Sequence, residues 1–302
     1  MAFILGAPRS GTSWLSKLLG THPSLVAPPE THLFSRYLAP MHQTWSHHRS
    51  AFDEVRREIA AGVAPRDRVF GLATVLTSQD FDRLTKDFVD GTMDRVIASK
   101  PGARIVVEKT PAHSNHVDLI DRLTDGNALF IHLIRDGREV AESLVRVSST
   151  WGRRWAPNDP DAAAAMWRRF VLGALEAREL DDRYIEVRYE ALVRSPQDEL
   201  DRIFDFLGVS PLHIDPKADG TVVPVAPTAF TTGTPEPQGF RGEASRWSPD
   251  IAFEIERIAG PLMASLGYEL DPTLSSRPHR TIQSAKSVGR RLRRRLRRTI
   301  RQ

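Results

Sequence analysis

The chain has 302 residues, of which 40% are hydrophobic and 26% charged, so it can bury a full core in one large α/β domain. It contains no cysteine, which excludes disulfides and thiol catalysis and makes a reducing compartment natural. No apolar run is long enough to span a bilayer, and the first predicted strand begins at Phe3. We therefore expect neither a membrane anchor nor a signal peptide.

The N-terminal segment predicts a buried strand, a glycine-bounded loop and a helix in immediate succession. The strand covers residues 3–6, and the helix carries Trp14 and Leu18 on one face before it closes at Gly20. Gly6 and Gly11 let the backbone approach an anion closely, and the first N–H groups of the helix point at that anion. The segment therefore predicts a phosphate-binding loop.

This loop nearly matches the G-x4-G-K-[ST] motif of nucleotide triphosphatases, but Thr12 stands where the motif needs lysine. The substitution argues against ordinary ATP or GTP hydrolysis, whereas Arg9 can supply a bidentate contact to an anion. A strand-to-helix turn without a ligand is the alternative interpretation.

The run Pro8-Arg9-Ser10-Gly11-Thr12-Ser13-Trp14 closely resembles the cofactor loop of sulfotransferases that use 3′-phosphoadenosine 5′-phosphosulfate (PAPS), in their carbohydrate and protein-tyrosine branch. The resemblance implies a P-loop-like fold and PAPS as cosubstrate. It also implies that the cofactor is bound by Arg9, Ser10, Gly11, Thr12, Ser13 and Trp14.

The resemblance implies a general base in the segment that follows a second strand-like piece at 25–27. Several carbohydrate and protein-tyrosine sulfotransferases have a catalytic glutamate at a similar distance from the loop, and Glu30 takes that place here. His32 is the alternative because an imidazole titrates near neutrality, whereas Glu30 needs desolvation to raise its pKa. An exposed glutamate without a role remains the third interpretation.

Residues 35–100 have mainly helical patterns, which we interpret as an insertion on the acceptor side. A strand predicted at 104–107 leads to Lys109, and the resemblance implies that this lysine neutralises charge on the leaving group. A lysine at a polar strand end is the alternative. His113 and His116 share a face of the predicted next helix, but two histidines without a third ligand make a poor metal site. We therefore expect no metal.

A continuous apolar run predicts a buried strand at 128–134, and the spacing of Asp136 and Glu139 predicts a capping box at the start of the next helix. In the sulfotransferase family a strand-end arginine and a serine eight residues later hold the 3′-phosphate of the cofactor. Arg135 and Ser143 match both. An arginine that only caps the sheet edge is the alternative.

The last predicted strand, 184–189, ends in a tyrosine that lies close to the adenine in relatives, so the resemblance assigns Tyr189 to the cofactor. A core tyrosine is the alternative. Arg241 and Gly242 resemble the late loop that closes over the phosphates, although Arg241 could be a solvated loop residue. We expect a long loop over 209–248 and a helix over 251–266.

Eleven of the 42 basic residues lie between Arg277 and the end, where there is no acid, so the rest of the chain has 31 basic and 38 acidic residues. Val288, Leu292 and Leu296 recur among the arginines, which predicts a basic amphipathic helix on an anionic membrane surface. A nucleic-acid contact is less favoured because no aromatic residue is present for stacking. A solvated, disordered tail is the other alternative.

Together the patterns predict an α/β fold with a P-loop-like central parallel sheet flanked by helices on both faces. We expect a sulfotransferase domain over 1–271, with the helical insertion at 35–100, and a tail over 272–302. The expected reaction moves a sulfuryl group from PAPS to a hydroxyl or amine of a carbohydrate, glycolipid or natural product. A kinase-like P-loop protein is the alternative. We expect a bacterial cytoplasmic enzyme, attached peripherally at the inner membrane surface.

Overall fold

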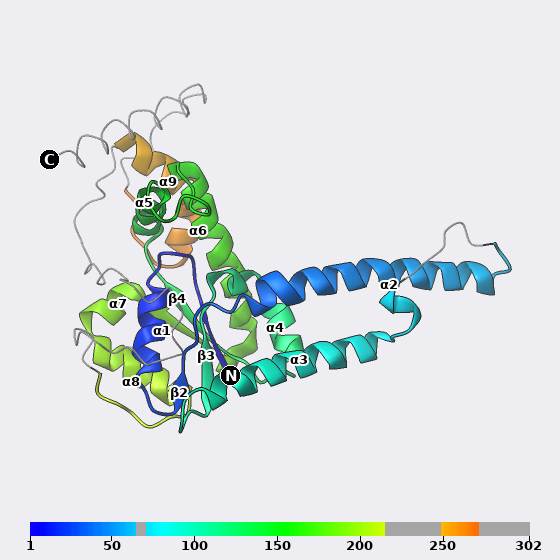
Figure 1. Cartoon of the computed structure of the whole chain (residues 1–302). Helices are drawn as coiled ribbons and strands as arrows, with labels where there is room; N and C mark the ends of the chain where they lie inside the picture. Colours follow the sequence, from blue (N-terminus) through cyan, green and yellow to red (C-terminus); the bar gives the residue numbers. More distant parts are fainter. Residues whose placement is uncertain (65–70, 215–248, 272–302) are drawn as a thin grey trace. The chain divides into compact units, whose positions relative to one another are not determined.

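A computed structural model describes residues 1–64, 71–214 and 249–271, which form two compact units (Figure 1). The sheet unit contains residues 1–6, 11–134 and 170–214 as far as they are described, and the helical unit contains 7–10, 135–169 and 249–271. The predicted extent of one catalytic domain, 1–271, stays a prediction.

The sheet unit is built on five parallel strands in the order β2-β3-β1-β4-β5. Their bounds are β1 Ala2–Leu5, β2 Leu25–Val26, β3 Ile105–Glu108, β4 Leu129–Ile134 and β5 Tyr184–Arg188. The four strands predicted at 3–6, 104–107, 128–134 and 184–189 are confirmed as β1, β3, β4 and β5. Their ends are shifted by one residue at most. The parallel pairing places the carboxyl ends of all strands along the same edge, where ligand loops gather in α/β folds.

Helices cover both faces of this sheet, as the sequence predicts. Alternate residues of β1 face opposite sides, so Ile4 packs in one apolar cluster and Phe3 in another. The first cluster is closed by α1 Thr12–Gly20, α7 Tyr189–Arg194 and α8 Pro196–Phe206. The second is closed by η1 Leu33–Leu38, α3 Ser78–Ala98, α4 Val117–Leu123 and η4 Glu176–Arg183.

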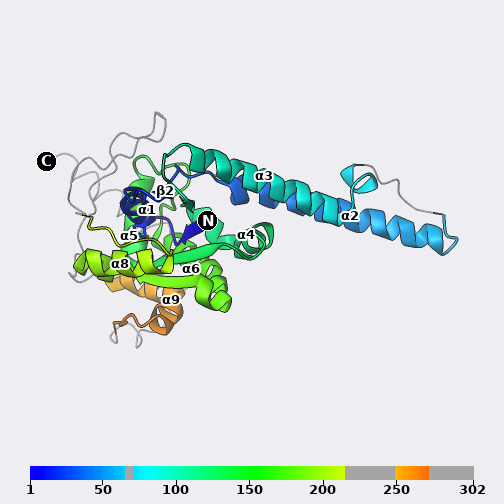
Figure 2. The ribbon, with the colours of Figure 1, turned by 90° about the horizontal axis from the view of Figure 1, so that it is seen from below.

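The predicted insertion is helical and consists of α2 Ala39–Ala60, the short η2 Leu72–Thr74 and α3. In both views α2 and α3 lie side by side and extend away from the sheet (Figures 1 and 2). The rings of Trp45 and Phe81 stack with their centroids 4.2 Å apart and join the two helices. Thr77 and Asp80 form a capping box that starts α3.

The helical unit contains α5 Gly137–Ser148, the first part of α6 Pro160–Leu175 and α9 Pro249–Ser265. A Cβ atom at Gly137 would lie 3.0 Å from the Trp167 ring and 3.2 Å from Met263 Sδ, so the glycine permits close packing of three helices. Arg138 binds both Asp136 and Glu256 and links α5 to α9. The helix predicted over 251–266 is confirmed as α9.

Several expectations fall outside the described residues. Arg241, Gly242, most of the loop predicted over 209–248 and the whole tail over 272–302 belong to this group. Within the described ranges, no helix combines the length and the apolar character that a membrane span requires.

Candidate active site

The loop between β1 and α1 needs glycine at both of its ends. Gly6 has a φ of 150°, and a Cβ atom there would lie 2.6 Å from the carbonyl oxygen of Leu133. Gly11, with a φ of 96°, precedes α1, and a Cβ atom there would lie 2.5 Å from the Tyr189 ring. The Gly6 N–H donates to Ser114 Oγ at 2.9 Å, which fixes the start of the loop. The glycines thus serve a tight turn and close packing.

The middle of the loop carries two unusual polar residues. Arg9 has a φ of 75°, in the left-handed region that few side chains adopt. The Ser10 side chain is buried, yet its Oγ has no hydrogen-bond partner within the described part of the chain. A buried hydroxyl without a partner costs free energy, so this oxygen is suited to binding an added group. A phosphate or sulfate oxygen fits that requirement.

Helix α1 follows the loop without a side-chain cap among the described residues. The N–H groups of Trp14 and Leu15 both donate to the Gly11 carbonyl. Earlier N–H groups at a helix start have no partner within the helix and attract anions through the dipole. Thr12 is buried and Ser13 is exposed, so the two predicted loop hydroxyls differ in their access to solvent.

In the helical unit, Arg9 and Ser143, two of the predicted cofactor residues, lie in contact. Arg9 Nε donates to Ser143 Oγ at 3.1 Å, and the guanidinium carbon lies 5.3 Å from the centroid of the Trp151 ring. Trp151 and Trp155 are 60% and 40% exposed, with their rings 5.5 Å apart. Sequence reasoning missed both tryptophans, because a cation–π contact across 142 residues has no local signal.

Arg135 lies between β4 and α5 and is held by contacts to α5 and α6. Its Nε and Nη2 donate to Glu139 Oε2 at 3.0 and 2.6 Å, and the Trp167 indole N–H donates to its carbonyl oxygen at 3.0 Å. Asp136 accepts from the Arg138 N–H at 2.8 Å and starts α5. Asp136 is thus the N-cap of α5, where the spacing predicts the helix to begin, and Glu139 Oε2 pairs with the Arg135 guanidinium.

The three predicted catalytic residues lie together in the sheet unit. Lys109 Nζ is 2.5 Å from Glu30 Oε1, and His32 Nε2 is 3.6 Å from Glu30 Oε2. Burial lowers the pKa of His32, and the nearby Arg36 lowers it further, although Glu30 opposes the shift. His32 is therefore neutral near physiological pH and able to accept a proton.

The surroundings of Glu30 differ from the expectation of a desolvated base. Its side chain is 38% exposed, whereas that of Lys109 is 9% exposed. Within the described part of the chain, the main influence on the Glu30 carboxylate is therefore its contact with Lys109. Desolvation has a smaller effect on it. A paired carboxylate of this kind is oriented by the lysine and open to an incoming hydroxyl.

The structure also corrects the expectation for His113 and His116. His113 belongs to the short helix η3 Pro111–Asn115, and His116 lies between η3 and α4, so the two do not share one helix. His113 is buried and binds Glu108 instead, with Nδ1 2.7 Å from Oε2. Sequence reasoning missed Glu108, because a glutamate at a strand end is ordinarily exposed.

Tyr189 lies in the core of the sheet unit and is 2% exposed. Its ring fills the space beside Gly11 and meets the Trp14 ring edge-on at 6.0 Å. The predicted contact between Tyr189 and adenine stays a prediction.

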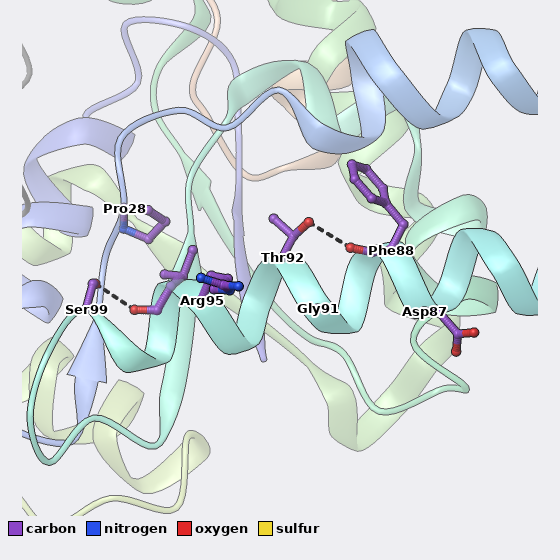
Figure 3. A pocket seen from close by; sticks show the side chains of 8 residues that line it. Pro28, Asp87, Phe88, Gly91, Thr92, Arg95 and Ser99 are labelled. Carbon is purple, nitrogen blue, oxygen red and sulfur yellow. Dashed lines mark hydrogen bonds between the residues drawn. The ribbon is translucent and has the colours of Figure 1, made fainter.

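A pocket of about 560 Å³ lies along α3 (Figure 3). Pro28, two positions before Glu30, forms part of its wall, while Phe88 and Arg95 project from the helix. Phe88 is 52% exposed, so the pocket offers an aromatic surface on the predicted insertion.

Comparison with known families matches residues 2–213 to the sulfotransferase family. Nodulation protein NoeE of Sinorhizobium fredii is 29% identical over 235 residues, which are 71% of this chain and 51% of NoeE, about half its length. Protein-tyrosine sulfotransferase 1 of Danio rerio is 24% identical over 89% of this chain and 72% of its own.

Solved structures show the same fold. The sulfotransferase domain of the Synechococcus PCC 7002 olefin synthase gives a TM-score of 0.55 at 23% identity, over 90% of this chain and 95% of that domain. The sulfotransferase domain from the curacin biosynthetic pathway gives 0.54 at 24% identity, over 90% and 98%.

Proposed function

From the premise that this chain belongs to the sulfotransferase family, we propose that it moves a sulfuryl group from PAPS to a hydroxyl or amine. The observation that carries the proposal is the loop after β1, where the buried Ser10 hydroxyl lacks a partner among the described residues. The following helix start and Arg9 add positive potential. This combination suits an anionic phosphosulfate better than a neutral ligand.

In this proposal the predicted cofactor residues divide by the part of PAPS that they bind. The loop and helix start, from Arg9 to Trp14, bind the 5′-phosphosulfate. Arg135 and Ser143 bind the 3′-phosphate, for which a charged arginine and a hydroxyl donor are suitable partners. Tyr189 contacts the adenine, and the resemblance assigns Arg241 and Gly242, which lie outside the described residues, to the phosphates.

The chemical step needs a base, a positive charge and an aligned donor. When bound, PAPS supplies an activated sulfuryl group. Glu30 removes the acceptor proton as the acceptor oxygen forms its bond to sulfur. The bond from sulfur to the leaving phosphate breaks, and Lys109 stabilises the charge that grows there. The products are the sulfate ester, 3′,5′-adenosine bisphosphate and a proton held by Glu30.

His32 is the alternative base in this proposal. Its lowered pKa keeps the ring neutral, and its Nε2 lies 3.6 Å from the Glu30 carboxylate. A proton accepted by either group would therefore remain within the same cluster.

We propose an acceptor of the carbohydrate, glycolipid or natural-product class. The pocket on α3 supports the proposal that the insertion contacts the acceptor. Pro28, which lies in the same segment as Glu30, lines this pocket together with residues of α3. The basic tail supports a lipid-linked acceptor at an anionic membrane surface, since eleven basic residues lie there without an acid.

The test uses sulfur-labelled PAPS with four acceptors: 2-naphthol, chitotetraose, dodecyl maltoside and an acidic tyrosine peptide. We expect label in at least one product, also in the presence of a chelator, and tighter binding of 3′,5′-adenosine bisphosphate than of ADP or ATP. Preference for ATP, without labelled product, would favour the kinase-like alternative.

A further inference from the structure

A buried carboxylate at the end of β3 binds the segment that follows Glu30. The Glu108 side chain is 1% exposed. Its Oε1 accepts from the Thr110 hydroxyl at 2.6 Å, from the Thr31 hydroxyl at 2.8 Å and from the Thr31 N–H at 3.2 Å. Its Oε2 lies 2.7 Å from His113 Nδ1. We call Glu108, Thr31, Thr110 and His113 the Glu108 cluster.

The Glu108 cluster binds four consecutive backbone N–H groups, those of residues 31–34. Their acceptors in chain order are the Glu108 carboxylate at 3.2 Å, the Thr110 hydroxyl at 3.2 Å, the Thr31 hydroxyl at 3.1 Å and His113 Nε2 at 3.2 Å. These groups stand at the start of η1, where a helix leaves its N–H groups without internal partners. The cluster therefore determines the path of this backbone.

The hydrogen bonds also define the protonation of the cluster. Because His113 Nε2 accepts from the Phe34 N–H, the ring hydrogen is on Nδ1 and is donated to Glu108. Burial alone would raise the pKa of Glu108, but the bonds from His113, Thr110 and Thr31 outweigh burial and keep the pKa below its usual value. Glu108 therefore stays ionised and keeps its donors.

Two neighbouring residues of the strand end bind two neighbouring residues of the segment. Lys109 pairs with Glu30, and Glu108 binds Thr31. The Glu30 side chain is 38% exposed, and its Oε1 contacts Lys109 Nζ. Its position depends on the lysine contact and on the backbone that the cluster fixes.

We propose that Glu108 is a positioning residue whose cluster fixes residues 31–34 and thereby holds the Glu30 carboxylate on Lys109. This inference rests on the proposed function of Glu30 as the base. It assigns Glu108 no contact with substrate; it acts through the backbone of the segment.

The experiment removes one hydroxyl from the cluster and keeps the side-chain shape. Thr31→Val takes away a donor to Glu108 and the acceptor of the Leu33 N–H, whereas Thr31→Ser retains both. Thr124→Val is the control, because among the described residues the buried Thr124 hydroxyl binds only the carbonyls of Ile120 and Asp121 in its own helix turn. Glu108→Gln is a second test of the carboxylate itself.

Two measurements follow in the full-length protein. Amide hydrogen exchange of a peptide covering 28–36 should accelerate about tenfold in Thr31→Val, while a peptide covering β1 stays unchanged. With PAPS and 2-naphthol, kcat should fall about tenfold at an unchanged KM for PAPS. Thr31→Ser should restore both values, and Thr124→Val should alter neither.

The double variant separates positioning from a general structural defect. If the cluster acts through Glu30, Thr31→Val should lower kcat little further in the Glu30→Gln background. An equal loss in both backgrounds, or unchanged exchange at 28–36, would overturn the inference.

Failure of the proposed function has a different signature. Parental turnover by Glu30→Gln would remove Glu30 as the base, and with it the role assigned to Glu108. Absence of label transfer to all four acceptors, with faster exchange at 28–36, would refute the activity while showing that the cluster anchors the segment.

Discussion

Lys109 and Glu30 form an ion pair, with Nζ 2.5 Å from Oε1. The residue proposed to stabilise the leaving group and the residue proposed to remove the acceptor proton therefore position one another. Removing either side chain releases the other from its place. A loss of turnover in a Lys109 variant therefore combines lost charge stabilisation with a displaced carboxylate, and the two contributions are not additive.

Glu30→Gln should keep the parental affinity for 3′,5′-adenosine bisphosphate and lose roughly 100-fold in kcat, because an amide cannot accept the acceptor proton. Binding is measured by calorimetry, and turnover with labelled PAPS and 2-naphthol. If turnover stays near the parental value, His32→Gln should be examined next, and a loss there would transfer the role of base to His32.

Arg135→Ala should weaken 3′,5′-adenosine bisphosphate by about 2–4 kcal/mol, because a charged, hydrogen-bonded contact to the 3′-phosphate is lost. Adenosine 5′-monophosphate, which lacks that phosphate, serves as the control ligand and should bind almost as before. Equal losses for the two ligands would contradict the assignment.

Phe88→Ala should raise the acceptor KM several-fold, since burying an aromatic side chain against a ligand is worth about 1–3 kcal/mol. The KM for PAPS should not change. Leu84→Ala is the matched control, because Leu84 is 51% exposed on α3 but does not line the pocket. The same KM change in both variants would mean that the pocket is not the acceptor contact.

His132 predicts a dependence of stability on pH. It is buried on β4, and burial lowers its pKa to about 3, with smaller contributions from Arg178 and Arg188. Because the unfolded chain binds a proton near the ordinary value of 6.5, stability falls below that pH by about 1.4 kcal/mol per unit until about 3. Urea unfolding from neutral pH to 5 should show a shallower decline in His132→Phe. Parallel declines would refute this contribution.

A chain that ends at Ser276 should stay folded, turn over 2-naphthol at the parental rate and lose binding to anionic vesicles. Each basic side chain near such a surface contributes about 1 kcal/mol, an attraction that salt weakens. Sedimentation with vesicles measures the binding. Unchanged sedimentation would place the membrane contact elsewhere, and lost turnover would show that the tail supports catalysis.

The sequence predicts what depends on neighbours along the chain. The strands and α1 were identifiable because apolar runs end at glycines or charged residues, and the same runs position Lys109 and Arg135 at strand ends. The ion pair between Arg135 and Glu139 was not predicted, because the spacing of Asp136 and Glu139 suggested a capping role for Glu139 instead. Both choices satisfy local rules.

The rest of the site depends on contacts across long separations. Thr31 and Glu108 are 77 positions apart, and Arg9 and Ser143 are 134 apart. Only a resemblance to relatives could suggest the second pair, and nothing in the order of residues suggested the first. Burial of Glu108 was equally hidden, because a glutamate at a strand end is ordinarily exposed.

Arg9 has a consequence for the evolution of this chain. A non-glycine residue with a φ of 75° costs about 1 kcal/mol or more in the folded state, whether or not an anion is bound. Glycine would relax the backbone there and remove the guanidinium that Ser143 and Trp151 hold. Selection for heat resistance and selection for anion affinity thus favour different residues at position 9, and laboratory evolution toward thermostability alone should lose this arginine early.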